Sequence, residues 1–365
     1  MTQRFSIHVF PAQRGDALWI EYGAGNAPQH LLIDGGIAAT GRTHLLQRIE
    51  ELGTPLHFEL LVITHIDLDH IQGILAFLEE LPDGVTFGDI WFNGWDQLKA
   101  SGLEPMGIKE GIRLSEILKK TYSESWNKAS GGEAIALRAN GDVVSYRLEG
   151  GMGLTVLSPG HEQLNKLREE WDKVLESFGA AEEAGDGGAF ADEQAHPLGE
   201  LEPMGPVDVQ ALAEAKFTED VTVPNGSSIA LALEFGGRCA LMLGDAYPTV
   251  VARSVQQLLT GSRLEVDAVK LAHHGSRNNT DRTLASMISA PTWIFSSNGA
   301  NNTKHPHPEA VARVLHDGHG VETLVFNYRT DFNEMWDSAD LKSEHCYQAV
   351  YGDGKRPVTV HLGLQ

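Results

Sequence analysis

The stretch Thr64-His65-Ile66-Asp67-Leu68-Asp69-His70 places four possible metal-binding side chains within six consecutive residues. An apolar run at 58–63 precedes it and predicts a buried strand, whereas the apolar residues that follow recur at helical spacing. We therefore expect a tight loop between a strand and a helix. Alternate residues of an extended segment point the same way, which would aim His65, Asp67 and Asp69 at one side. The turn into the helix would then bring His70 next to Asp69.

Two interpretations fit this loop: a solvated polar loop with two surface histidines, or a metal site. Neutral imidazole and carboxylate are the ligand types that suit zinc, manganese or iron. Four such side chains at H-x-D-x-D-H spacing, directly after a buried strand, favour the metal site.

The composition is that of a soluble globular protein with a substantial core. The chain has 365 residues, of which 42% are hydrophobic and 21% charged. No apolar run approaches the roughly 20 residues that a membrane-spanning helix needs, and the first residues show no signal peptide. The two cysteines, Cys239 and Cys346, cannot form a disulfide framework, so we expect a reduced, cytoplasmic setting.

The net charge of −22 argues against general electrostatic binding to nucleic acid, because the field repels polyanions at long range. It leaves a phosphoester substrate open, since metal ions at the site can invert the local potential.

A β/α rhythm extends along most of the chain. Strands are predicted at 5–10, 17–22, 31–34, 87–93, 143–148, 154–157, 228–235, 239–243, 266–271, 292–296, 321–327 and 358–362, and helices at 43–52, 164–178, 248–260 and 308–316. Residues 100–140 give no motif. The segment 179–202 is rich in Ala, Gly, Asp and Glu and has no Lys or Arg, which predicts a mobile surface insertion extending to about residue 220.

Polar residues recur where the later strands end. Asp245 follows one strand, His273 and His274 follow the next, and a third is followed by the polar segment 298–308, which contains His305. Each has an ordinary explanation as a cap, a surface loop or a turn, but together they predict a site at one sheet edge built from both halves of the chain. Asp34, after an earlier strand, is either a turn former or a group that holds a ligand histidine.

These motifs, in this order, resemble the metallo-β-lactamase superfamily, and within it the branch with the hydrolase domain of the DNA-uptake protein ComEC and the phosphorylcholine esterases. The matching elements are Gly15-Asp16, Leu32-Ile33-Asp34-Gly35-Gly36, the stretch 64–73, Asn225-Gly226-Ser227-Ser228, Leu243-Gly244-Asp245, His273-His274-Gly275-Ser276, and 299–302 followed by His305-Pro306. Residues 160–222 and the tail after about 330 have no counterpart.

The resemblance implies one domain over residues 1–365 with an αββα fold, in which two β-sheets lie face to face with helices outside. It also implies two divalent metal ions at one sheet edge. His65 and Asp67 would serve one metal, Asp69 and His70 the other, and Asp245 would bridge them. One of His273 and His274 would complete the second site. We assign His273 to the metal and His274 to proton donation.

Some assignments stay open at this point. The family usually has histidine where Asp67 stands, which fits the ComEC-like branch and gives a more oxygen-rich first site suited to Zn²⁺ or Mn²⁺. The remaining ligand of that site is His161 or Asn225. His305 is a further ligand or an acid facing the phosphate.

The favoured function is hydrolysis of a phosphodiester by metal-activated water, with Lys270, Arg277 and Lys304 as candidate cations and His274 or His305 as proton donor. Lys270, His274 and His305 are therefore the predicted catalytic residues. The alternative is the same site acting on carboxylic esters, lactones, thioesters or amides. A third hypothesis is a non-catalytic, metal-stabilised module whose acidic insertion binds a basic protein partner. No membrane partner is expected.

Overall fold

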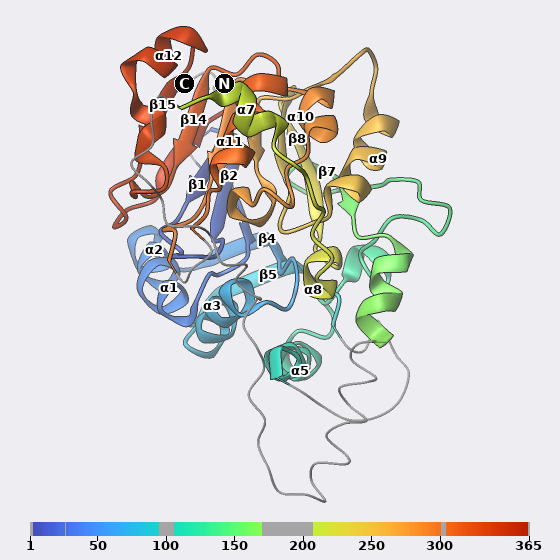
Figure 1. Cartoon of the computed structure of the whole chain (residues 1–365). Helices are drawn as coiled ribbons and strands as arrows, with labels where there is room; N and C mark the ends of the chain where they lie inside the picture. Colours follow the sequence, from blue (N-terminus) through green and yellow to red (C-terminus); the bar gives the residue numbers. More distant parts are fainter. Residues whose placement is uncertain (1–2, 26, 95–105, 170–206, 301–303, 364–365) are drawn as a thin grey trace, which may run out of the picture.

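Two mixed β-sheets form the framework of the protein, whose computed structural model describes residues 3–25, 27–94, 106–169, 207–300 and 304–363 (Figure 1). The first sheet has the strand order β16-β1-β2-β3-β4-β5, and the second has the order β15-β14-β13-β11-β9-β8-β7-β6. The C-terminal strand β16 pairs antiparallel with β1, so the two ends of the described chain meet in the first sheet.

The strands of the first sheet are β1 (Gln3–Val9), β2 (Leu18–Ala24), β3 (Gln29–Ile33), β4 (Leu56–Val62), β5 (Val85–Trp91) and β16 (Val358–His361). Those of the second are β6 (Val144–Arg147), β7 (Gly153–Ser158), β8 (Ala230–Phe235), β9 (Arg238–Met242), β11 (Ala268–Lys270), β13 (Thr292–Phe295), β14 (Thr323–Phe326) and β15 (Gln348–Tyr351). A separate short pair consists of β10 (Leu264–Glu265) and β12 (Ile288–Ser289).

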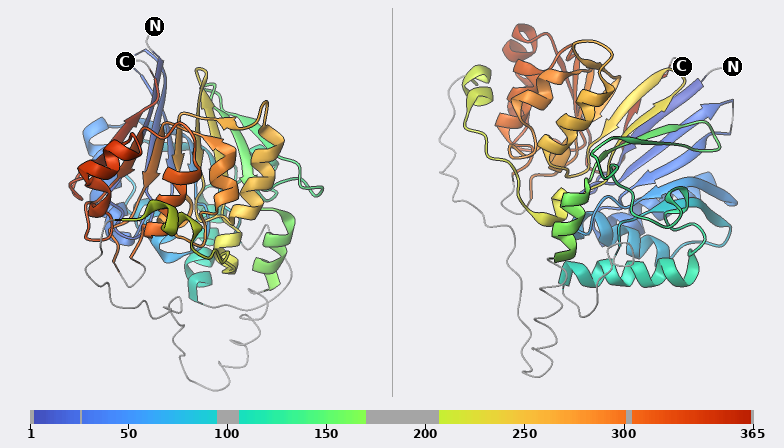
Figure 2. Two further views of the ribbon diagram at one scale, coloured as in Figure 1. Left: turned by 45° about the horizontal axis from the view of Figure 1, so that its top comes forward. Right: turned by 90° about the vertical axis from the view of Figure 1, so that its right-hand side faces the viewer.

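The helices cover the outer faces of the sheets (Figures 1 and 2). Near the first sheet lie α1 (Ala38–Thr40), a π-helical turn η1 (Gly41–Leu45), α2 (Leu46–Leu52), α3 (Leu68–Glu79) and α5 (Met106–Thr121). Near the second lie α7 (Val209–Glu214), α9 (Pro248–Leu258), α10 (Arg282–Met287), α11 (Pro308–Asp317) and α12 (Ala339–Glu344). Short elements complete the set: α8 (Val223–Gly226) and the 3₁₀ turns η2 (Lys128–Ser130), η3 (Ala272–Gly275) and η4 (Glu334–Asp337).

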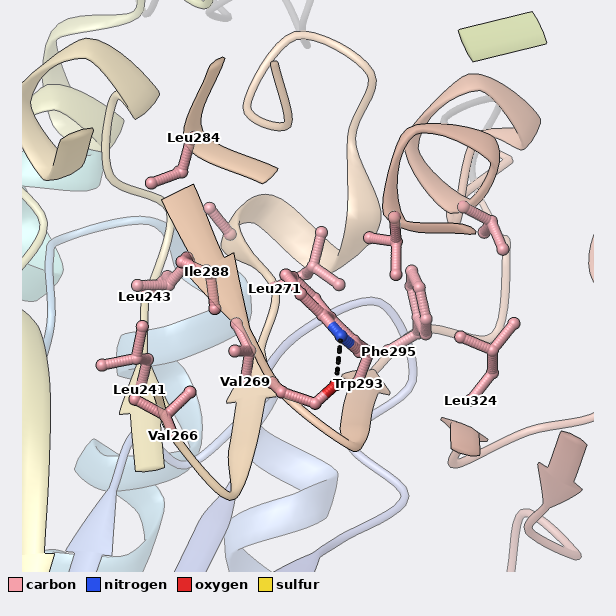
Figure 3. Packing of buried hydrophobic residues seen from close by; sticks show 14 of the residues in the cluster. Leu241, Leu243, Val266, Val269, Leu271, Leu284, Ile288, Trp293, Phe295 and Leu324 are labelled. Carbon is pink, nitrogen blue, oxygen red and sulfur yellow. Dashed lines mark hydrogen bonds between the residues drawn. The ribbon is translucent and has the colours of Figure 1, made fainter. Parts of the chain in front are cut away.

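The core has three layers, because each sheet is buried on both faces. In β4, Leu60 and Val62 join the cluster between the sheets, while Leu61 and the following Ile63 face the helices of the first half. Figure 3 shows the helix-facing side of the second sheet, where Val269 packs beside Trp293 and the Trp293 indole N–H donates to the carbonyl of Ala290. The four-layer αββα order predicted from the sequence is therefore confirmed.

The structure differs from the expected elements in a few places. Helix α5 lies within the region 100–140 that gave no motif, and α12 and β15 lie in the tail, where only the strand at 358–362 was predicted. The end of the expected helix 164–178 and most of the expected insertion 179–220 lie outside the described residues. The described part of that insertion, from 207 onward, is not a surface loop, since Val209, Ala213 and Asp220 are buried. Among the described helices, none combines the length and apolar character needed to cross a bilayer.

Candidate metal centre

The predicted site residues gather at one edge, where strands of both sheets end. The loop 64–70 follows β4, Asp245 follows β9, and His273 and His274 follow β11. The strands β9 and β11 run parallel, so their carboxyl ends lie on the same edge, the usual place for ligands on such sheets.

Close backbone approaches hold these segments together, and two glycines permit them. A methyl group at Gly15 would lie 1.7 Å from the carbonyl oxygen of Asp69, and one at Gly73 would lie 1.8 Å from that of Gly35. The turn that carries Asp16 and the helix α3 can therefore pack directly on their neighbours only because these positions lack a side chain.

Four histidines converge on a single oxygen of Asp245. The Nε2 atoms of His70, His274, His273 and His65 lie 3.5, 3.7, 3.8 and 3.9 Å from Asp245 Oδ2, respectively. Asp245 itself is 2% exposed, and its backbone N–H donates to the Ser228 hydroxyl at 3.0 Å. Imidazole nitrogens aimed at one buried carboxylate form the kind of donor set that binds a divalent metal ion.

The opposite ring nitrogen of each histidine contacts a different polar group. His70 Nδ1 lies 2.8 Å from Asp34 Oδ2, His65 Nδ1 lies 2.9 Å from the Thr64 hydroxyl, and His274 Nδ1 lies 3.3 Å from Asp16 Oδ1. His273 Nδ1 lies 3.0 Å from Asn279 Oδ1 and 3.3 Å from Asp220 Oδ2. An Nδ1–H held by a hydrogen bond, as in His70, His65 and His273, leaves the Nε2 lone pair free for a metal and fixes the orientation of the ring. The contact between His274 Nδ1 and Asp16 is an ion-pair contact and not a hydrogen bond.

We call Asp69, His70 and His274 the inner group. His274 Nε2 lies 3.3 Å from His70 Nε2 and 3.7 Å from Asp69 Oδ2. The His70 and His274 side chains are 0% and 3% exposed. Ligand atoms of Asp16, His70, Asp245 and His274 all lie within 4.8 Å of one another, close enough to surround one ion.

We call His65 and Asp67 the outer group. His65 Nε2 lies 3.5 Å from Asp67 Oδ2, and the Asp67 side chain is 40% exposed, so this side of the centre opens to solvent. His273 approaches Asp245 beside His305, with ring centroids 5.0 Å apart.

The residues present fit a divalent metal. Buried polar atoms without a hydrogen-bond partner among the described residues include His65 Nε2 and Asp245 Oδ1, both of the type that coordinates metals. Burial alone would lower the pKa of His70, but the carboxylates of Asp245 and Asp34 outweigh burial and raise it well above its ordinary value. Burial would raise the pKa of Asp245, but His70, His274 and His273 hold it well below its ordinary value. The centre thus favours positive charge next to Asp245, which a metal ion also supplies.

Three site residues adopt a left-handed backbone conformation that is uncommon outside glycine. The φ angles are 56° for Asp34, 46° for His273 and 56° for His274. Each such residue costs about 1–3 kcal/mol, so the surrounding contacts must hold it in place. Concentration of such strain at one edge is typical of functional sites.

The candidate cations occupy different environments. Lys270 is fully buried and forms an ion pair with Asp16 Oδ2, so it does not face the solvent side of the site. Arg277 pairs with Glu309 at 3.0 Å. Arg14, which lies in the turn before Asp16 and was not among the predicted cations, has a side chain that is 36% exposed, and its Nε lies 3.9 Å from Asp69 Oδ2.

The two candidates for the remaining ligand of the first metal site, His161 and Asn225, lie in different surroundings. His161 is exposed at the start of the helical segment after β7, whereas Asn225 is buried and its Nδ2 lies 3.3 Å from His273 Nδ1. Asp34 contacts His70 directly, which agrees with the alternative that it holds a ligand histidine. His305 is buried beside His273 and His274, and burial together with these rings keeps its pKa well below the ordinary value.

Sequence reasoning missed the contacts of Asp16, Asp220 and Asn279. Asp16 was noted only as part of a Gly-Asp motif, and its position near a buried lysine in the other half of the chain is a tertiary feature. Asp220 lies in a region without a counterpart in the family, so no pattern marked it.

The chain therefore folds into four layers, with the loop 64–70 at the shared edge of the two sheets. This is the αββα arrangement that its resemblance to the metallo-β-lactamase superfamily implies. No family model matches the chain. It is 28% identical over 127 residues to ComE operon protein 3 of Bacillus subtilis (strain 168), a stretch that covers 34% of this chain and only 15% of that protein.

Two solved structures show a weak similarity in the overall path of the chain. Zn(2+)-bound PqqB from Methylobacterium extorquens has a TM-score of 0.40 and 12% identity, covering 94% of this chain and 86% of that chain. A mutant of CmlA beta-hydroxylase has a TM-score of 0.38 and 11% identity, covering 98% of this chain and 54% of that chain.

Proposed function

We propose that this protein is a metal-dependent hydrolase that binds two divalent ions, Zn²⁺ or Mn²⁺, around Asp245 and cleaves phosphodiesters. The observation that carries the proposal is the convergence of four histidine Nε2 atoms within 3.9 Å of Asp245 Oδ2. The local similarity to ComE operon protein 3 supports the same branch of the superfamily.

The proposed ligands divide between the two groups. Asp69, His70 and His274 would hold the inner ion, and His65, Asp67 and His273 would hold the outer ion, with Asp245 available to both. His274 is assigned to the inner ion because its Nε2 lies 3.7 Å from Asp69 Oδ2 and 3.3 Å from His70 Nε2. The sequence prediction had instead made His274 a proton donor and His273 the ligand of the second site.

When bound, such a metal pair lowers the pKa of a water molecule toward neutrality and stabilises negative charge on phosphoryl oxygens. The protein's own groups orient the components. Asp34 holds the His70 ring through a hydrogen bond, so that its Nε2 atom stays toward Asp245 without reorganisation during the reaction, and the Asp16 carboxylate lies 3.3 Å from His274 Nδ1. His305 is held neutral by burial and by its neighbours, and it donates a hydrogen bond to the leaving oxygen.

Arg14 is the proposed contact for the anionic substrate. Its side chain is 36% exposed and lies beside Asp69 of the inner group, and guanidinium groups bind phosphoryl oxygens through paired N–H donors. Lys270, one of the three cations predicted from the sequence, instead pairs with the buried carboxylate of Asp16.

The test is turnover of bis-p-nitrophenyl phosphate with zinc and with manganese, compared with nitrocefin and a simple lactone. We expect hydrolysis of the phosphodiester, reduced about ten-fold in kcat/KM in Arg14→Ala. Arg4→Ala is the matched control, because Arg4 pairs with Glu21 on the first sheet and should leave turnover unchanged. Turnover of the lactone or nitrocefin alone would assign the centre to carboxylic substrates. Metal binding without any turnover would favour the non-catalytic module.

A further inference from the structure

The segment 207–222, which we call the arm, reaches the metal centre from a part of the sequence without a family counterpart. Its helix α7 buries Val209 and Ala213 beside α11. The buried Arg313 of α11 donates from its guanidinium to the carbonyl oxygens of Ala213 at 3.4 Å and Ala215 at 3.1 Å. The arm is therefore anchored at one end by a fixed set of hydrogen bonds.

At its other end the arm inserts Asp220 beneath His273. Asp220 is 7% exposed, and its backbone N–H donates to the Asn278 carbonyl at 3.0 Å. Its Oδ1 accepts hydrogen bonds from the backbone N–H and hydroxyl of Thr222 at 2.9 and 2.8 Å. A carboxylate held in this way has little freedom to move.

The second oxygen of Asp220 faces the metal centre. Asp220 Oδ2 accepts from Asn225 Nδ2 at 2.6 Å and from Asn279 Nδ2 at 3.0 Å, and it lies 3.3 Å from His273 Nδ1. Asn279 Nδ2 also lies 3.2 Å from the carbonyl oxygen of Asp245, while its Oδ1 lies 3.0 Å from His273 Nδ1. One carboxylate from the arm thus organises groups around both His273 and Asp245.

His273 needs such support because its backbone is strained. Its φ and ψ of 46° and 51° are left-handed, a conformation that a non-glycine residue keeps only when its surroundings impose it. A hydrogen-bond acceptor beside Nδ1 keeps the ring proton on that nitrogen. Nε2, which lies 3.8 Å from Asp245 Oδ2, is then the nitrogen that can bind a metal.

We propose that Asp220 is a positioning residue for His273, which makes the arm a working part of the metal centre. The inference deepens the proposed function and rests on it in one respect, the assignment of His273 to a metal. Loss of the Asp220 carboxylate would release the ring and weaken the outer metal site.

The experiment compares Asp220→Ala and Asp220→Asn with Asp208→Asn in the full-length protein. Asp208 is a matched control, since it caps α7 on the same arm, and asparagine caps a helix about as well as aspartate. Zinc is removed with a graded series of chelators, and the affinity of each metal equivalent is measured together with thermal unfolding and phosphodiester kinetics.

We expect Asp220→Ala to weaken one zinc equivalent about 10- to 100-fold and to leave the other unchanged. Asp220→Asn should show a smaller loss of the same equivalent, and it decides the matter if the alanine variant does not fold. Asp208→Asn should match the wild type. Wild-type zinc affinity in the Asp220 variants, with only a lower unfolding temperature, would overturn the proposal and leave Asp220 a structural residue. Failure of the proposed function would look different, as a wild-type protein that binds zinc but does not hydrolyse phosphodiesters.

Discussion

The inner and outer groups of the centre share Asp245 but differ in the polar groups that contact the Nδ1 atoms of their histidines. In the inner group, His70 and His274 contact the buried carboxylates of Asp34 and Asp16 and are almost fully enclosed. In the outer group, His65 contacts a hydroxyl, that of Thr64, and Asp67 is 40% exposed, so Asp220 beside His273 is the one carboxylate that we place behind an outer ligand histidine. A carboxylate raises the basicity of a ligand histidine more than a hydroxyl does, and enclosure restricts exchange with water. The two metal positions are therefore not equivalent in their surroundings, and we expect the inner one to bind more tightly.

The largest effect is expected for Asp245→Ala, which removes the carboxylate that both groups share. Both metal equivalents should be lost, and turnover should fall at least about 100-fold. Metal analysis and phosphodiester kinetics check this, with the exposed Asp142→Ala as control. Retention of either metal at wild-type affinity would contradict the claim that both metal positions depend on Asp245.

The next largest effect is expected for Asp34→Ala, which should act on the inner group more than on the outer group. Asp34 accepts hydrogen bonds from the backbone N–H and hydroxyl of Thr64 at 2.8 and 2.7 Å as well as contacting His70. Asp34→Ala should weaken the inner equivalent about 10- to 100-fold, because the His70 ring loses its buried partner. Competition with a zinc-binding dye measures the change. A selective loss of the outer equivalent would reverse the proposed order of the two positions.

A smaller effect is expected when the backbone of the inner group is displaced. In Gly73→Ala the new methyl would meet the Gly35 carbonyl, so α3, which carries Asp69 and His70, must shift. We expect a loss of about 1–3 kcal/mol in the free energy of unfolding and a weaker inner equivalent. Urea unfolding tests this, and Gly261→Ala is the control because a methyl there meets open space. Equal free energies of unfolding in Gly73→Ala and Gly261→Ala would contradict the close packing of Gly73 on the Gly35 carbonyl.

The smallest effect is expected for Thr64→Val, which removes the hydroxyl beside His65 but keeps the shape of the side chain. The outer equivalent should weaken only a few-fold, since a hydroxyl contributes less than a carboxylate to the ligand histidine. The same dye competition applies. A loss as large as that in Asp34→Ala would show that the two groups depend equally on their supporting contacts.

The sequence predicted the parts of the fold and site that depend on local pattern. The loop 64–70 is contiguous and lies between a strand and a helix, so its four polar residues could be placed from periodicity alone. Asp245, His273 and His274 could be grouped because each follows an apolar strand. The fold class followed from the resemblance of these motifs, in their order, to the metallo-β-lactamase superfamily.

The parts that could not be predicted depend on contacts between distant segments. The pairing of Asp16 with Lys270 joins residues 254 positions apart, and the approach of Asp220 to His273 requires a segment that resembles nothing in the family. Lys270 was predicted to meet substrate because it lies near the histidines in sequence, but its burial depends on how the turn after β1 packs. Helix α5 was missed because the mixed composition of 100–140 hid its apolar face.

The central claim, that Asp245 organises a two-metal centre with a tighter inner position, is tested most directly by metal content during graded chelation. Protein purified without chelator is dialysed against chelators of increasing strength, and zinc and manganese are measured by mass spectrometry. We expect about two ions per chain, lost in two separate steps. A protein that holds no metal, and takes up none on reconstitution, would contradict it.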